Sequence, residues 1–147
     1  MNQITTQYVT ENGACYEQYV ITDPAAKTSL TITPERGGMI TGFTLDGDEY
    51  IWTRRPNFSE CNRPRFGVPV LFPSCGNPDG GVHNFDGKAY PMETHGFADL
   101  CGWDVESVGP DGVTLALEST PLTKFLYPFD FTLLVNYNLE DNKAAIS

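Results

Sequence analysis

The chain has 147 residues, of which 40% are hydrophobic and 19% are charged, so its composition is that of one globular domain and excludes wholesale disorder. Nine basic against nineteen acidic side chains give a formal net charge of -10, and the resulting field repels nucleic acids and anionic membrane surfaces. The longest apolar run covers residues 68–73, whereas a membrane-spanning helix needs about 20 apolar residues. We therefore expect neither a nucleic-acid partner nor a membrane partner.

Residues 1–8 have neither a basic head nor an apolar segment, which argues against a secretory signal and favours a cytoplasmic protein. The cysteines are too few and too scattered for a disulfide framework, so we expect free thiols at Cys15, Cys61, Cys75 and Cys101. No two of the cysteines and histidines lie at the short spacings of structural zinc sites. Nucleotide-binding and serine-hydrolase motifs are absent from the sequence, and we expect no metal and no cofactor.

Short segments of β-branched and aromatic residues, separated by turns, predict β-strands along most of the chain. The first of these strands are expected at residues 15–22, 28–33, 39–45 and 49–53, and another at residues 103–108. Asp-Gly pairs occur at residues 46–47, 79–80, 86–87 and 111–112. They are typical of tight turns because both residue types tolerate positive φ angles.

Two later segments show the alternation of strands with one buried face. Val113, Leu115 and Leu117 share a face of the first segment. Apolar residues at alternate positions share a face of the second: Phe131, Leu133, Val135, Tyr137 and Leu139. No window has a long apolar pattern at helical spacing, and the 11 prolines leave little room for a long helix. The prediction is an all-β fold, a sandwich of antiparallel sheets.

Two parts of the chain depart from this pattern. Residues 54–97 are dense in proline and glycine and have weak periodicity, and loops of that length are usually functional or disordered. Residues 138–147 resemble a turn followed by the start of another strand. We expect residues 1–147 to form a single β-sandwich domain, or a fragment of a larger domain that continues beyond Ser147.

Most arginines of this acidic chain gather in one short stretch: Arg54, Arg55, Arg63 and Arg65. A guanidinium donates well-oriented hydrogen bonds to sugar hydroxyls, carboxylates or phosphates, which favours a polar pocket rim. The alternative is a set of solvated loop charges paired with nearby carboxylates. Arg65 is the exception, because a buried strand predicted at residues 66–73 would fix its position.

His95 is the second candidate, because an imidazole can both donate and accept hydrogen bonds and titrates near neutrality. The alternative is a structural turn residue beside Gly96. Glu93 and Asp99 flank His95 and could tune it, although we expect both carboxylates to be solvated. Trp103 could form an aromatic wall for a sugar ring, but a tryptophan that opens a strand is more often a core residue.

Four motifs occur in order along the chain: Ile-Thr-Pro-Glu-Arg-Gly-Gly-Met-Ile at residues 32–40, Arg-Phe-Gly-Val-Pro-Val-Leu-Phe-Pro at residues 65–73, His-Gly-Phe-Ala at residues 95–98 with Trp103 behind it, and Tyr-Pro-Phe-Asp-Phe at residues 127–131. In order and spacing they resemble the aldose 1-epimerase (galactose mutarotase) superfamily. The nearest branch is similar to the hexose-6-phosphate epimerases.

The resemblance implies a β-supersandwich of which this chain is the N-terminal half, and an isomerase that interconverts the α and β anomers of a hexose or hexose phosphate. It implies that Arg65 and His95 hydrogen-bond the ring hydroxyls, with Asn77 a looser candidate on the same loop. The family's acid histidine and base glutamate would lie downstream of Ser147, so no catalytic residue is assigned here. One departure is Asp99, which stands where the phosphate-sugar branch often has arginine and would repel a phosphate.

Two alternatives remain open. The chain could be a non-catalytic carbohydrate-binding module that has Arg65 and His95 without the acid and the base. It could also be a structural β-domain whose open sheet edge near residues 143–147 recruits another chain, for example as a homo-oligomer.

Overall fold

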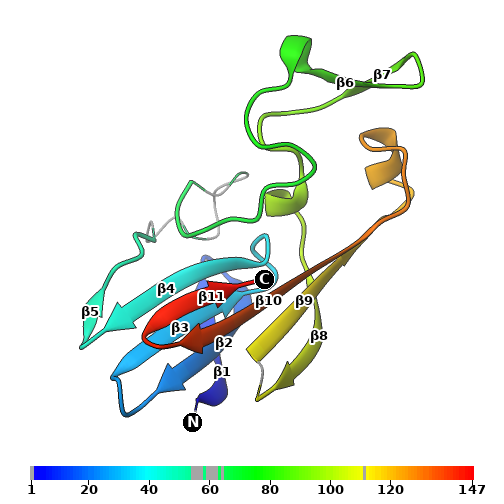
Figure 1. Ribbon diagram of the computed structural model, residues 1–147. Coiled ribbons are helices and arrows are strands. Elements are labelled where there is room, and N and C mark those ends of the chain that lie inside the picture. The colour runs from blue at the N-terminus through cyan, green and yellow to red at the C-terminus, as the bar shows by residue number, and fades with distance from the viewer. Residues whose placement is uncertain (1, 54–57, 59–62, 64, 111) are drawn as a thin grey trace.

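The strands that the structure describes form three antiparallel sheets (Figure 1). The computed structural model describes residues 2–53, 58, 63, 65–110 and 112–147. Arg54, Arg55 and Cys61 therefore lie outside the described residues. Within the described part, every helix is a three-residue 3-10 helix: η1 (Asp79–Gly81), η2 (Ala98–Leu100) and η3 (Thr123–Phe125). The predicted all-β class is confirmed.

The first sheet contains the N-terminal strands in sequence order: β1 (Gln3–Glu11), β2 (Ala14–Asp23), β3 (Thr28–Thr33), β4 (Met39–Leu45) and β5 (Asp48–Glu49). The strands predicted at residues 15–22, 28–33 and 39–45 are confirmed as β2, β3 and β4. Strand β1 was not predicted, because most of its side chains are exposed and no buried face shows an alternating pattern. Pairing with β2 along its whole length makes this segment a strand.

The prediction of a strand at residues 49–53 is wrong except at Glu49, because β5 ends at that residue. The Glu49 carboxylate accepts hydrogen bonds from the backbone N–H groups of Phe43 and Ile51, both at 2.8 Å. The Glu49 side chain thus takes the backbone N–H of Phe43 in β4, which a neighbouring strand would otherwise use. The pairing of β5 with β4 therefore ends after one further bond, from the Tyr50 N–H to the Phe43 carbonyl at 2.9 Å. Trp52 follows in irregular, exposed chain.

The second sheet contains the C-terminal strands in the spatial order β11-β10-β9-β8. They are β8 (Asp104–Gly109), β9 (Gly112–Glu118), β10 (Thr132–Glu140) and β11 (Lys143–Ile146). Leu115 of β9 and Val135 of β10 are cross-strand partners on the buried face, while Leu134, which directly precedes Val135, is exposed. The predicted buried faces of β9 and β10 and the predicted last strand, which lies at a sheet edge, are confirmed, although Ala116 on the other face of β9 is also buried.

The core lies between these two sheets, with apolar side chains from both. Ile21, Leu30 and Ile32 of the first sheet are fully buried with Val113 and Leu115 of the second. This is the sheet-on-sheet packing of a β-sandwich, and it buries a continuous apolar layer.

Two residues tie the sandwich to the turn between β3 and β4. The Tyr137 hydroxyl of β10 donates a buried hydrogen bond of 2.6 Å to the carbonyl of Gly38. Trp103 is only 4% exposed, and a β carbon at Gly38 would lie 2.9 Å from its ring. The interpretation of Trp103 as a core residue is confirmed.

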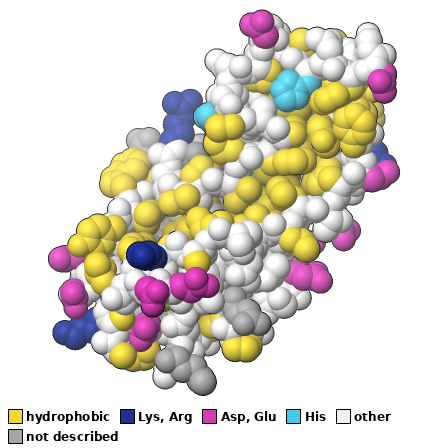
Figure 2. Space-filling view, in the orientation of Figure 1, with side chains coloured by type: hydrophobic (Ala, Val, Ile, Leu, Met, Phe, Trp, Pro, Cys, Tyr) yellow, Lys and Arg dark blue, Asp and Glu magenta, His cyan; other side chains and the backbone are white. Residues whose placement is uncertain are grey.

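The long middle segment contains a hairpin that stands away from the sandwich (Figure 1). It consists of β6 (Val82–Phe85) and β7 (Lys88–Pro91), joined by Asp86 and Gly87, both at positive φ as a two-residue turn requires. Phe85 packs edge-on against Tyr127 and Phe129, with ring centroids 5.6 Å and 5.1 Å apart. An apolar surface runs over this part of the molecule (Figure 2). No helix in the described ranges is long and apolar enough to cross a membrane.

Candidate functional site

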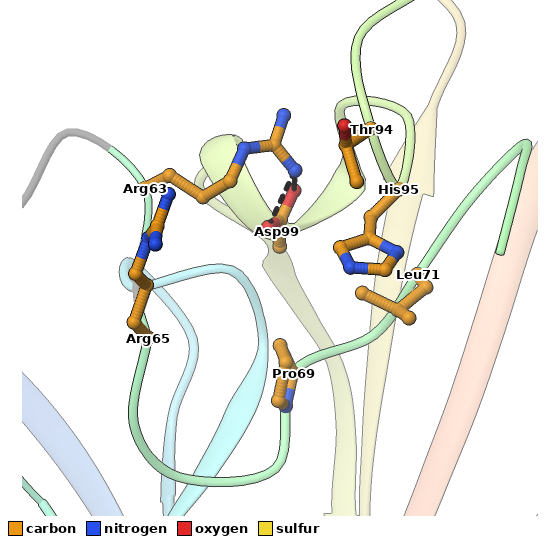
Figure 3. Close-up of a pocket in the computed structure, with 7 residues that line it drawn as sticks. All are labelled: Arg63, Arg65, Pro69, Leu71, Thr94, His95 and Asp99. Carbon is orange, nitrogen blue, oxygen red and sulfur yellow. Dashed lines mark hydrogen bonds and ion pairs between the residues drawn. The ribbon is translucent and has the colours of Figure 1, made fainter. Parts of the chain in front are cut away.

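A hollow of about 430 Å³ opens where the middle segment crosses the sandwich (Figure 3). Seven described residues line it: Arg63, Arg65, Pro69, Leu71, Thr94, His95 and Asp99. The first four precede the β6–β7 hairpin and the last three follow it, so the hairpin's two ends bring distant sequence together. Two arginines, a histidine and a carboxylate thus face one space with an apolar floor.

The floor segment is attached to the sandwich by single bridges instead of the buried strand predicted at residues 66–73. Val68 and Ile40 exchange backbone hydrogen bonds of 2.9 Å and 3.3 Å, and the Gly67 N–H donates to the Trp52 carbonyl at 2.9 Å. Gly67 has a φ of 68°, and a β carbon there would lie 2.5 Å from the Ile40 carbonyl oxygen. Only glycine fits this approach, which fixes the backbone beside Arg65.

His95 is oriented by Gly76 on the neighbouring loop. The His95 backbone N–H donates to the Gly76 carbonyl at 2.9 Å, and the Gly76 N–H donates to the His95 Nδ1 at 3.0 Å. Because Nδ1 accepts a hydrogen bond, the proton of the neutral ring lies on Nε2. His95 therefore presents an N–H donor to the hollow, and its two bonds to Gly76 also fit the alternative of a structural turn residue (Figure 3).

Asp99 is buried, which corrects the expectation that it is solvated. Its side chain is 2% exposed, and Arg63 Nη1 donates to both carboxylate oxygens at 3.0 Å and 2.9 Å. Burial raises the pKa of Asp99 above its ordinary value, and the Arg63 charge opposes that rise without cancelling it. The second flanking carboxylate, Glu93, is 80% exposed and accepts from Arg63 Nη2 at 3.3 Å. The expectation of solvation holds only for Glu93.

The three predicted sugar ligands are placed differently. Arg65 and His95 line the same hollow, and Arg65 is exposed, with no ion pair or side-chain hydrogen bond to any residue that the structure describes. Asn77 is also exposed but does not line the hollow, and its Oδ1 accepts a hydrogen bond from the hydroxyl of Thr94, which does. The sugar-binding roles of these residues stay predictions.

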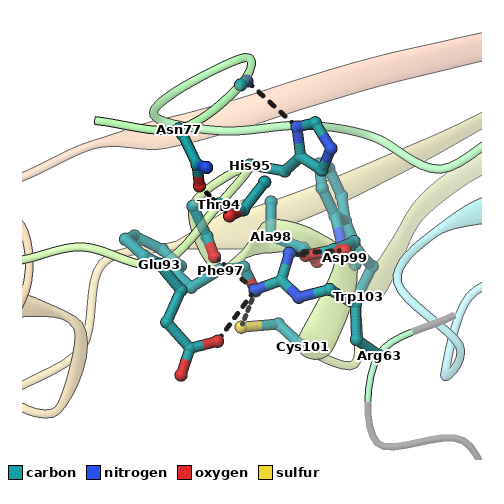
Figure 4. Close-up of polar contacts among 12 residues, drawn as sticks. Arg63, Asn77, Glu93, Thr94, His95, Phe97, Ala98, Asp99, Cys101 and Trp103 are labelled. Atoms are coloured by element: carbon teal, nitrogen blue, oxygen red, sulfur yellow. Dashed lines mark hydrogen bonds and ion pairs between the residues drawn. The ribbon is translucent and has the colours of Figure 1, made fainter. Parts of the chain in front are cut away.

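Arg63 was not predicted as a site residue. Of the four clustered arginines only Arg65 stood out in the sequence, and no local pattern identifies which guanidinium meets Asp99. The polar network around it joins Arg63 to Glu93, Gly96 and Asp99 (Figure 4). Thr94 was missed for the same reason, because its part in the hollow depends on the path of the loop.

The free thiols Cys15, Cys75 and Cys101 form no disulfide, and the described ranges contain no group of three or more metal-ligating side chains placed to hold a metal ion. A second hollow of about 420 Å³ shares Arg65 and Pro69 with the first and is lined further by exposed Tyr50 and Trp52. The main hollow is therefore lined by the possible hydrogen-bond donors of Arg65 and His95 beside the ion pair of Arg63 and Asp99.

Comparison with known protein families supports the resemblance seen in the motifs. The family model described as aldose 1-epimerase matches residues 17–147. This chain belongs to the aldose 1-epimerase family. Both lining segments of the hollow lie within the matched range. No curated protein matches the chain.

Solved structures of other proteins share the fold. The Slr1438 protein from Synechocystis sp. PCC 6803 is 30% identical over 95% of this chain and 48% of its own, with a TM-score of 0.79. A galactose mutarotase-like protein from Lactobacillus casei ATCC 334 is 28% identical over 88% of this chain and 42% of its own, with a TM-score of 0.73. A galactose mutarotase related enzyme from Lactobacillus acidophilus is 28% identical over 84% of this chain, with a TM-score of 0.72. This chain spans less than half the length of each.

Proposed function

We propose that this chain supplies part of the sugar-binding site of an aldose 1-epimerase-type isomerase that interconverts the α and β anomers of a hexose or hexose phosphate. The observation that carries the proposal is the convergence of Arg65 and His95 on one hollow, in a chain of this family. The volume of about 430 Å³ lies within the range of small-molecule sites.

The two donors suit the hydroxyl oxygens of a pyranose ring. Gly76 leaves the neutral His95 ring with one N–H to donate from Nε2, and the Arg65 guanidinium carries donors that no described residue accepts. Pro69 and Leu71 give the ring an apolar floor. These groups bind and orient the sugar, so that its anomeric centre is held in one place.

The acid and base of ring opening are assigned outside these lining residues. Epimerisation of this kind needs one group to protonate the ring oxygen while another removes the anomeric hydroxyl proton. In the described lining, His95 Nδ1 already accepts from Gly76, and the Asp99 carboxylate is held by Arg63. The same observation favours the second candidate function, a carbohydrate-binding module without catalysis.

The ion pair also bears on whether a phosphorylated sugar is tolerated. The expectation that Asp99 repels a phosphate assumed an uncompensated anion. Arg63 compensates that charge at 2.9 Å, and Arg65 adds a further cation to the hollow. Glucose 6-phosphate therefore belongs among the sugars to be tested.

The test is NMR of glucose, galactose and glucose 6-phosphate with and without the protein. Binding is expected to broaden or shift sugar signals, and Arg65→Ala or His95→Ala to weaken the affinity about tenfold each, since each removes a hydrogen bond to the ligand. His83→Ala is the matched control, because the other histidine lies on the β6–β7 hairpin and outside the lining. Sugar signals that stay unchanged when the protein is added would overturn the proposal.

Anomer exchange measured in the same samples tests whether the chain is a binding module without catalysis. Exchange above the spontaneous rate that disappears in the His95→Ala variant would place an acid and a base within this chain and would exclude the binding module. Binding without faster exchange agrees with acid and base groups outside the described lining.

A further inference from the structure

The guanidinium of Arg63 is surrounded by acceptors on both sides of His95 (Figure 4). Nη1 donates to both oxygens of Asp99, and Nη2 donates to the Gly96 carbonyl at 2.8 Å and to Glu93 at 3.3 Å. Glu93 and Gly96 are two residues before and one residue after His95. The Arg63 side chain therefore binds the turn that carries His95 on both sides of that residue.

The turn is a conformation that requires support from its surroundings. His95 has a φ of 70° and Gly96 a φ of 78°. A non-glycine residue in this left-handed region is strained, and such residues persist only where neighbouring contacts determine them. A β carbon on Gly96 would collide with the Phe72 carbonyl, so the turn lies directly against the floor segment, and the Phe97 N–H donates to the Phe72 carbonyl at 2.9 Å. On its other side the turn is held by Arg63.

Asp99 fixes the position of Arg63 in turn. The Asp99 backbone lies so close to Gly37 that a β carbon on Gly37 would overlap it. The Gly37 N–H also donates to the Cys101 carbonyl at 3.0 Å. The helix η2 is thereby attached to the turn between β3 and β4. Both bonds to Asp99 come from Nη1, which holds that end of the guanidinium at the carboxylate and leaves Nη2 to donate to the Gly96 carbonyl.

We propose that Arg63 is a positioning residue of the sugar site. Fixed by Asp99, its guanidinium holds the Gly96 carbonyl and so keeps the His95 ring against Gly76, with Nε2–H directed into the hollow. Arg63 acts through His95, whereas Arg65, which no described residue pairs with, is the arginine left to contact a sugar. The sugar part of this inference rests on the proposed function, but the state of the His95 ring can be measured without sugar.

The main experiment reads the His95 tautomer by ¹⁵N NMR of the imidazole nitrogens in a His83→Gln background, where His95 is the remaining histidine. The test variant is the double substitution Arg63→Gln with Asp99→Asn. It removes both charges together, because deleting one partner of a buried ion pair leaves an uncompensated charge and destabilises strongly. The expected result is a shift of the Nδ1 and Nε2 resonances towards a mixture of tautomers, and an about tenfold weaker affinity for glucose.

The matched control removes an ion pair elsewhere on the molecule. Lys124 and Asp130 form an exposed pair, and neither residue lines the hollow, so Lys124→Gln with Asp130→Asn should change neither the His95 resonances nor glucose binding. Unchanged His95 resonances in the folded Arg63→Gln, Asp99→Asn protein would overturn the inference.

The test still applies if the double variant does not fold or if the parent protein binds no sugar. If the double variant fails to fold, Arg63→Lys is used, because lysine keeps the charge beside Asp99 but lacks the planar fork that reaches Gly96 as well. Shifted His95 resonances then support positioning, and unchanged ones overturn it. If the parent protein binds no sugar while the variants still shift the His95 resonances, the proposed function fails and the positioning role stands.

Discussion

The two-sheet core and the segment that forms the hollow are held together by different means. In the core, Leu115 and Val135 face each other across paired strands, and the same contact type repeats along β9 and β10. In the segment of residues 63–101, one hairpin and two isolated bridges are the described pairings. The rest of its order comes from individual contacts, such as Gly76 with His95 and Arg63 with Gly96. A repeated apolar layer stabilises the whole sandwich, whereas single polar contacts each determine one local feature.

This difference predicts that a change in the core lowers global stability while the site geometry in the folded molecules is kept. Leu115 is fully buried between the sheets, and Leu115→Ala should lower the free energy of unfolding by about 2–5 kcal/mol. Urea unfolding measures the loss. Leu134→Ala is the control, because Leu134 is 53% exposed on the opposite face of the neighbouring strand and should have little effect. Equal losses in the two variants would contradict the assignment of the buried face.

A change in the site segment should instead act locally. Gly96→Ala is expected to disturb the His95 resonances and weaken sugar binding, and to lower stability by more than about 1 kcal/mol, because alanine is strained at positive φ and its β carbon meets Phe72. Gly87→Ala is the matched control, since Gly87 has a φ of 77° but nothing within 4 Å of the added carbon. The same thermal and NMR response in both variants would show that backbone strain alone, and not the close approach to Phe72, matters.

The smallest expected effect concerns the pH dependence of stability. Burial raises the pKa of Asp99, so the folded protein binds this proton more tightly than the unfolded chain does. The stability that Asp99 contributes is therefore full below the pKa of the unfolded carboxyl and is lost as pH rises through the raised folded pKa. The free energy of unfolding of the wild type, relative to Asp99→Asn, should rise as pH is lowered from about 7 to about 4. Urea unfolding at several pH values measures this difference, and a fall over the same range would refute the direction assigned to the pKa.

How far each region could be predicted follows from the same contrast. The positions of β2, β3, β4, β9 and β10 were accessible because apolar alternation and turn residues are visible in short windows. The exposed strand β1 escaped detection, since only its pairing with β2 makes it a strand. The Asp86–Gly87 turn was recognised, but the hairpin strands on either side of it were not, because they bury little.

For the candidate site, the motifs pointed to Arg65 and His95, which the structure places in one hollow. The separate expectation that Asp99 is solvated was wrong, and the motifs gave no reason to select Arg63. The residues that surround a buried carboxylate are distant in sequence, since Arg63 precedes the β6–β7 hairpin and Asp99 follows it. No local window holds both.

The sequence by itself determined the all-β class, the buried faces of the late strands, the membership of Trp103 in the core and the family resemblance that the comparisons confirm. These properties depend on periodic apolar patterns and on contiguous motifs, which tolerate small displacements. Only the tertiary structure decided that Arg63 pairs with Asp99 and that Gly76 leaves the His95 proton on Nε2. Hydrogen bonds depend on distance and direction within a few tenths of an ångström, so they are settled only when distant segments have been brought together.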